Sequence, residues 1–112
     1  MTATYYQRGE ALDYTNTGTE TIKSGTVIEY GARIGIAESD ILPGELGVIH
    51  VAGVFEMPKK DTTKIDAGAE VYWNPAEGAE GITATAGTLT KAGFAVAEAA
   101  AEAVTVLVKI NA

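Results

Sequence analysis

The segment GVIHVAGVFEMPK, residues 47–59, is the most informative part of the chain for the fold class. From Val48 to Met57 it is rich in β-branched residues, which favour strands, and Pro58 closes it. Gly53 in the middle indicates a bulge or a close packing contact. Side chains two residues apart share one face of a strand. One face is apolar (Ile49, Val51, Gly53, Phe55 and Met57), and the other is only partly apolar (Val48, His50, Ala52, Val54 and Glu56).

Short β-type segments separated by Gly, Pro, Asn and Asp make up the rest of the sequence. The stretch AVAEAAAEAV, residues 95–104, is rich in helix-forming Ala and Glu, but so short a helix is marginal without packing. We therefore expect a hairpin connection there with at most one helical turn. The sequence predicts an all-β fold, a small single-domain β-barrel or β-sandwich of short, mostly antiparallel strands. Further strands are expected at 4–7, 11–15, 26–30, 33–38, 69–73, 82–85, 92–97 and 104–110.

Two segments share a pattern that indicates a repeat. IKSGTVIEYG (22–31) and IDAGAEVYWN (65–74) both place Ile three residues before Gly, and both continue into an apolar strand that ends in an aromatic residue. Either they are pseudo-symmetric halves of one barrel, or they coincide by chance in a β protein punctuated by glycine. Two copies are too few for a solenoid.

Length and composition limit the class of protein. A chain of 112 residues with 46% hydrophobic and 21% charged residues is expected to fold as one domain over 1–112, with residues 1–10 as a possible extended arm. The net charge of −7 and the scattered basic residues argue against nucleic-acid binding. Lys59, Lys60 and Lys64 have Asp61 and Asp66 among them, which favours a solvated loop over a phosphate site. No signal peptide or apolar run of membrane-spanning length is visible, so we expect a soluble cytoplasmic product without a membrane partner.

The sequence offers little catalytic equipment. It contains no phosphate-binding Gly-x-x-x-x-Gly-Lys motif and no Gly-x-Ser-x-Gly elbow around Ser24 or Ser39. One histidine and no cysteine cannot build a zinc site in a single chain. His50 is therefore interpreted as a strand residue at a surface or a subunit contact. We expect no catalytic residues, no metal, no cofactor and no enzymatic activity.

A resemblance to a known family gives a more specific prediction of the function. Six segments in this order resemble the tailed-phage capsid cement, or head decoration, protein family, and they span almost the whole chain: YYQRGEALDYTNTG, IKSGTVI, RIGIAESDI, GVFEMPK, AGAEVYWN and TVLVKIN. Members of that family have sometimes been labelled RecA/RadA-like recombinases. That label lacks support here, because the nucleotide-binding loop and the basic character that it requires are both missing.

The resemblance implies a structural protein of the virion, made in the bacterial host cytoplasm. It would bind the outer face of the assembled head and bridge neighbouring subunits of the major capsid protein, as a homotrimer or homodimer. Expected contacts are Tyr5, Tyr6, Gln7 and Arg8, because aromatic residues and Arg are enriched at interface centres, with His50 as a further candidate. In the alternative structural interpretation, both tyrosines pack on their own domain. The alternative function is a small ligand-binding barrel or enzyme that uses His50 with a nearby carboxylate.

Overall fold

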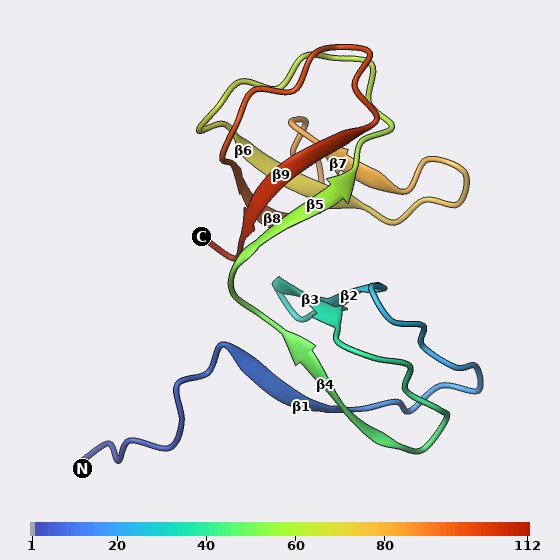
Figure 1. The fold of residues 1–112 in the computed structure, drawn as a ribbon, viewed down its shortest axis with the longest axis vertical. Helices are drawn as coiled ribbons and strands as arrows, with labels where there is room; N and C mark the ends of the chain where they lie inside the picture. Colours follow the sequence, from blue (N-terminus) through green and yellow to red (C-terminus); the bar gives the residue numbers. More distant parts are fainter. Residues whose placement is uncertain (1) are drawn as a thin grey trace.

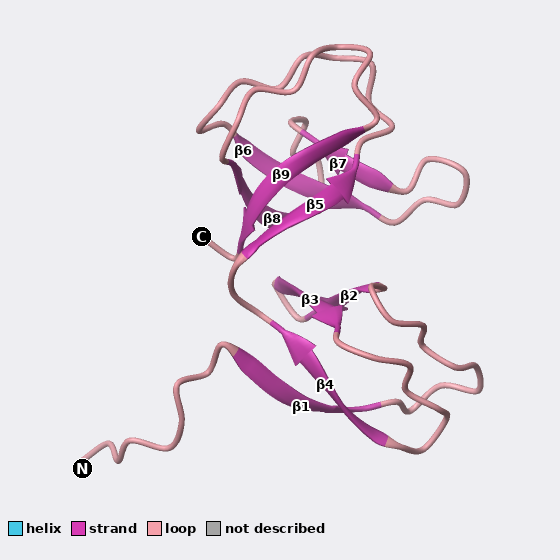
Figure 2. Cartoon of the chain, in the orientation of Figure 1, coloured by secondary structure: helices cyan, strands magenta, loops and turns pink. Residues whose placement is uncertain are grey.

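The computed structural model describes residues 2–112, which form two antiparallel sheets and no helix (Figure 2). The first sheet has the order β1-β4-β3-β2, with β1 (Ala11–Thr15), β2 (Val27–Tyr30), β3 (Arg33–Ala37) and β4 (Leu46–His50). The second has the order β5-β9-β8-β6-β7, with β5 (Val54–Pro58), β6 (Glu70–Asn74), β7 (Gly81–Thr83), β8 (Thr90–Ala95) and β9 (Thr105–Ile110). The all-β prediction is confirmed. Neither sheet closes into a barrel, so the fold is sandwich-like.

The prediction of a single strand over residues 48–57 is wrong in one respect. The segment forms two strands, β4 and β5, which belong to different sheets (Figure 1). Gly53 has a φ of 121° and lies between them, where the chain passes from one sheet to the other. The predicted alternation still holds within each strand, because Ile49 and Met57 are buried while Glu56 is exposed. His50 is half-buried on the face opposite Ile49.

One other expectation needs correction. Residues 4–7 form no strand; they belong to an extended segment that leads away from β1 (Figure 1). Residues 96–104 connect β8 to its antiparallel partner β9 without a helical turn, so the expected hairpin connection is confirmed, and Ala99 within it makes an isolated antiparallel bridge with Ile65. The remaining predicted strands are confirmed, with small shifts at their ends. No helix within residues 2–112 is long and apolar enough to cross a membrane.

The two sheets have the same topology. The order β1-β4-β3-β2 in the first half (residues 11–50) corresponds to β5-β9-β8-β6 in the second half (residues 54–110), and β7 is an addition to the second half. The register corresponds as well, since the pair Leu12↔Ile49 has its equivalent in Phe55↔Val108. The similar segments 22–31 and 65–74 therefore occupy equivalent places in two related halves, although the halves do not form a barrel.

The hydrogen bonds around the two similar segments correspond in detail. Ile22 forms an antiparallel bridge with Ile41, as Ile65 does with Ala99. The Gly25 N–H donates to Ala37 O at 2.8 Å, and the Gly68 N–H donates to Ala95 O at 2.7 Å. Both glycines have φ near 85°, which suits the turn that precedes β2 or β6.

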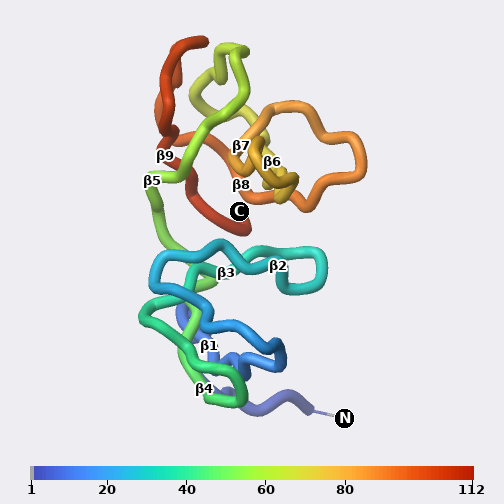
Figure 3. The backbone as a smooth tube through the Cα atoms, turned by 90° about the vertical axis from the view of Figure 1, so that its right-hand side faces the viewer, coloured from blue at the N-terminus to red at the C-terminus, as the bar shows by residue number. Residues whose placement is uncertain are grey.

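The central strand β3 joins the two halves. Its Ile34 and Ile36 belong to the same buried cluster as the core of the second half, which includes Trp73. On its other face, Ala37 belongs to a smaller cluster within the first half. Figure 3 shows β2 and β3 beneath β8 and the C-terminus. One face of β3 therefore packs against the core of the second half, while its other face packs within the first half.

Candidate functional site

The N-terminal arm, residues 2–10, is the most exposed part of the molecule (Figure 1). Tyr5 and Tyr6 are 79% and 92% exposed, so neither packs on the body of the protein. The Arg8 guanidinium lies 3.2 Å from the Glu10 carboxylate, and both side chains face solvent. The carbonyl of Glu10 accepts a hydrogen bond from the Val51 N–H at 2.9 Å, which attaches the end of the arm to the body.

His50 lies beside the base of the arm, because Ala11 is its partner in the β1-β4 ladder. Its ring packs against Phe55 of the second half, with the ring centres 5.9 Å apart. Its Nε2 is 3.7 Å from the carboxylate of Glu38, so a histidine and a carboxylate are brought together. Sequence reasoning placed His50 on the less buried face but did not foresee its contact with the other half.

The environment of the His50–Glu38 pair gives little support for catalysis. Ser24 binds the segment that follows β3: its hydroxyl donates to the Glu38 carbonyl at 3.2 Å, and its N–H donates to Asp40 Oδ1 at 2.8 Å. The serine and the nearby aspartate therefore have a structural role in this loop. His50 lines neither of the two hollows described below. Within residues 2–112, no group of three His, Asp or Glu side chains is arranged to hold a metal ion.

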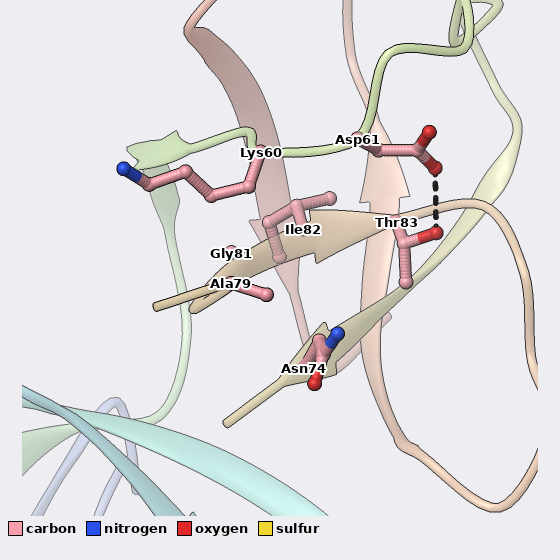
Figure 4. Close-up of a pocket in the computed structure, with 7 residues that line it drawn as sticks. All are labelled: Lys60, Asp61, Asn74, Ala79, Gly81, Ile82 and Thr83. Carbon is pink, nitrogen blue, oxygen red and sulfur yellow. Dashed lines mark hydrogen bonds between the residues drawn. The ribbon is translucent and has the colours of Figure 1, made fainter. Parts of the chain in front are cut away.

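One shallow hollow, of about 170 Å³, lies beside β7 (Figure 4). The Thr83 hydroxyl donates to Asp61 Oδ2 at 2.7 Å on its rim. This hydrogen bond is the main reason why the pKa of the Asp61 carboxyl lies below its ordinary value, and Thr63 and the charge of Lys59 lower it further against the opposing effect of burial. The residues that line this hollow are Lys60, Asp61, Asn74, Ala79, Gly81, Ile82 and Thr83.

Lys59 differs from the solvated residue expected in this loop. Its side chain is buried, and its ammonium donates to the carbonyls of Asp61 at 2.5 Å and Ala101 at 3.0 Å. It therefore ties the loop after β5 to the loop before β9. Asn16 has the equivalent place in the first half, where its buried amide donates to Ile41 O at 2.9 Å. Neither the sequence of this loop nor its charges indicated a buried lysine.

A second hollow, of about 200 Å³, is largely apolar and is lined mainly by residues of the first half. Tyr30 on its wall is 43% exposed and packs edge-to-face with Tyr14, at a centroid distance of 6.3 Å. Its lining residues are Leu12, Tyr30, Arg33, Val51 and Asn111.

One family model, described as phage cement protein, matches residues 6–110. The match covers both sheets and the part of the arm that contains Tyr6, Gln7 and Arg8. Comparison with curated proteins and with solved structures finds no match.

Proposed function

Because this chain belongs to the phage cement protein family, whose members are structural proteins of the phage capsid, we propose that it binds the outer surface of the assembled head and bridges neighbouring subunits of the major capsid protein. A bridging protein of this size works by binding rather than turnover. Many copies, each with a contact of roughly 800 Å² per partner, add their modest affinities over the lattice.

The exposed arm is the observation that supports this proposal best. Tyr5 and Tyr6 together present two aromatic side chains to solvent without a partner on the body, beside Arg8. Aromatic residues and Arg contribute most of the binding energy at many interfaces. An extended segment can add a strand to a neighbouring sheet or lie along a capsid subunit. The arm therefore provides the contact, and the paired sheets provide the rigid body that projects from the shell.

Removal of the arm tests this proposal. Purified protein is mixed with expanded, undecorated heads, and binding is measured by co-sedimentation. We expect the full chain to sediment with the heads, and we expect deletion of residues 1–8 to weaken binding at least tenfold, which corresponds to about 1.4 kcal/mol. The double substitution of Tyr5→Ala and Tyr6→Ala is expected to have most of the same effect.

Leu46→Ala is the matched control, because Leu46 is 65% exposed but lies on the body, in β4. It should bind as the unchanged chain does. Unchanged binding after deletion of the arm would show that the contact lies elsewhere on the surface. If the full chain itself fails to sediment with the heads, the proposed head binding is wrong.

A further inference from the structure

The second half contains one strand, β7, that has no counterpart in the first half. β7 pairs with β6 through Trp73↔Ile82, and Ile82 is 1% exposed within the large core cluster. On its other side β7 reaches the end of β5, because a Cβ on Gly81 would lie 3.0 Å from the carbonyl oxygen of Pro58. β7 therefore occupies the space between β6 and β5, although it forms no ladder with β5.

The equivalent space in the first half lies between β2 and β1, the two outer strands of the first sheet. No strand of residues 2–112 occupies it. Tyr30 of β2 holds the place of Trp73 in the similar segments 22–31 and 65–74. Tyr30 and Leu12 of β1 both line the second hollow. The hollow therefore lies where the first half lacks an equivalent of Ile82.

Exposure shows the effect of the missing strand on the first half. Trp73, which has Ile82 as its cross-strand neighbour, is 6% exposed, whereas Tyr30 is 43% exposed. Leu12 and Val51, on the wall of the second hollow, are half-buried. The first half thus has an apolar site that no side chain of the described residues covers.

The backbone of β2 is open beside this hollow. The Ala37 N–H donates to Thr26 O at 3.0 Å, so Thr26 directs its carbonyl toward β3. Because this direction alternates along an antiparallel strand, Glu29 directs its N–H and C=O groups away from β3, toward the outer edge of the sheet. Glu29 and Tyr30 are both exposed. Such an edge can pair with an extended segment of another chain.

Arg33 adds a positive charge to the wall of the second hollow. It is the β3 partner of Tyr30, and its side chain is exposed. None of the ion pairs within residues 2–112 includes Arg33. A guanidinium on an apolar hollow favours a carboxylate on the segment that occupies it. The site therefore fits an extended segment that combines a large apolar side chain with an acidic residue.

We propose that the first half binds an extended segment of a partner protein by strand addition at the open edge of β2. A large apolar side chain of that segment fills the second hollow, and a carboxylate of the segment pairs with Arg33. The bound segment completes the first half as β7 completes the second. Under the proposed head binding, on which this identification rests, the segment belongs to the major capsid protein. The site also adjoins the base of the arm, since the Val51 N–H donates to Glu10 O.

A synthetic copy of residues 77–85, EGAEGITAT, is a suitable probe because it contains β7. Its Glu80 lies two residues before Ile82, so both side chains share one face of an extended peptide. Titrated into the isotope-labelled full-length protein, the peptide should shift the amide NMR signals of Glu29 and Tyr30 until they saturate. A matched peptide with Ile82→Asp should bind at least tenfold more weakly.

Variants of the protein test the open edge and the charge separately. Glu29→Pro removes the outward N–H, and proline is tolerated in an edge strand when its N–H side faces solvent. It should weaken peptide binding at least tenfold. Glu29→Ala is the matched control, because it loses the same hydrogen bond from the Thr90 hydroxyl but keeps the N–H, and it should bind as the unchanged chain does. Arg33→Glu should weaken binding about threefold, and a peptide with Glu80→Lys should restore it.

The outcomes separate this site from the proposed function. A titration without saturable shifts around β2, or equal binding of the Ile82→Asp peptide, would overturn the proposal. Circular dichroism checks that the variants are folded, and the charge exchange between Arg33 and Glu80 decides if Glu29→Pro unfolds. In co-sedimentation with undecorated heads, Glu29→Pro should bind at least tenfold more weakly than Glu29→Ala. Equal binding of these two variants would show that the capsid protein does not use this edge, whereas a full chain that binds the peptide but not the heads would contradict head binding alone.

Discussion

At the scale of single residues, the side chain of Asn111 binds backbone groups of β3 that a neighbouring strand would normally bind. Its Oδ1 accepts from the Ile34 N–H at 3.0 Å, and its Nδ2 donates to the carbonyls of Ile34 and Val51, each at 2.8 Å. One side chain thus satisfies the backbone of β3 and of the link between the sheets. Its φ of 58° lies in the left-handed region, which Asn tolerates better than most residues.

Asn111→Ala should therefore be costly for its size. It leaves the N–H and carbonyl of Ile34 without this partner, and each unsatisfied buried group costs about 1–3 kcal/mol. We expect the free energy of unfolding, measured in urea, to fall by about 2–4 kcal/mol. Asn74→Ala is the control, because Asn74 Oδ1 only accepts from the Ala76 N–H in an exposed turn, and it should cost clearly less. Equal losses would contradict the special role of Asn111.

Gly93 in β8 shows how closely two strands can approach. A Cβ at this position would lie 1.9 Å from the carbonyl oxygen of Lys109 in β9, and the φ of Gly93 is +147°. Gly93→Ala must move backbone, so we expect a loss of more than about 4 kcal/mol of stability or a failure to fold. Gly87→Ala is the control, because its Cβ meets nothing within 4 Å although its φ is +50°. That variant should lose only about 1–2 kcal/mol by thermal unfolding.

At the scale of elements, local alternation predicted most strands well. The exposed and buried positions of β9 alternate throughout, and those of β5 alternate from Val54 to Pro58, as period-two patterning requires. The split between β4 and β5 could not be predicted in this way, because both strands are β-branched and the apolar pattern continues through residues 51–53. The positive φ of Gly53 and the change of sheet depend on where the second half packs.

The loop after β5 gives a prediction for pH. Hydrogen bonds from Thr83 and Thr63, with the charge of Lys59, hold the pKa of Asp61 below 3.8 in the folded protein. The ionised carboxylate therefore stabilises the fold above the unfolded pKa near 3.8, and this contribution disappears as the pH falls through the lower folded pKa.

Asp61→Asn removes the charge and keeps the shape of the side chain. Because Asp61 is partly exposed, we expect a loss below about 1 kcal/mol at pH about 7, and a smaller difference from the unchanged chain at pH about 3. Urea unfolding at both pH values measures this change. Thr83→Val removes the main donor and should reproduce most of the effect at pH about 7. A difference that grows toward low pH would contradict the assignment.

At the scale of the whole molecule, the shared cluster should make unfolding cooperative. Ile34 and Ile36 come from the first half but are buried with Trp73, which is the single tryptophan of the chain and reports on the second half. Tryptophan fluorescence and far-ultraviolet circular dichroism should give coincident urea transitions. Ile34→Ala should shift both transitions by about 2–5 kcal/mol. Val104→Ala, at an exposed residue, should shift neither by more than about 0.5 kcal/mol. If Ile34→Ala left the urea transition measured by tryptophan fluorescence unchanged, the halves would unfold separately.

The sequence by itself determined the strand content, the family and the lack of familiar catalytic motifs, because alternation and ordered motifs are local properties of the chain. It also indicated the N-terminal arm, but only the structure shows that Tyr5 and Tyr6 are exposed and do not pack on the body. The tertiary structure alone decided that Lys59 is buried and that the similar segments 22–31 and 65–74 have different surroundings. Both segments carry an aromatic residue in their strands at equivalent places, yet Trp73 is covered by the first half while Tyr30 is 43% exposed. Burial depends on which distant surface packs on a residue, and local pattern does not contain that information.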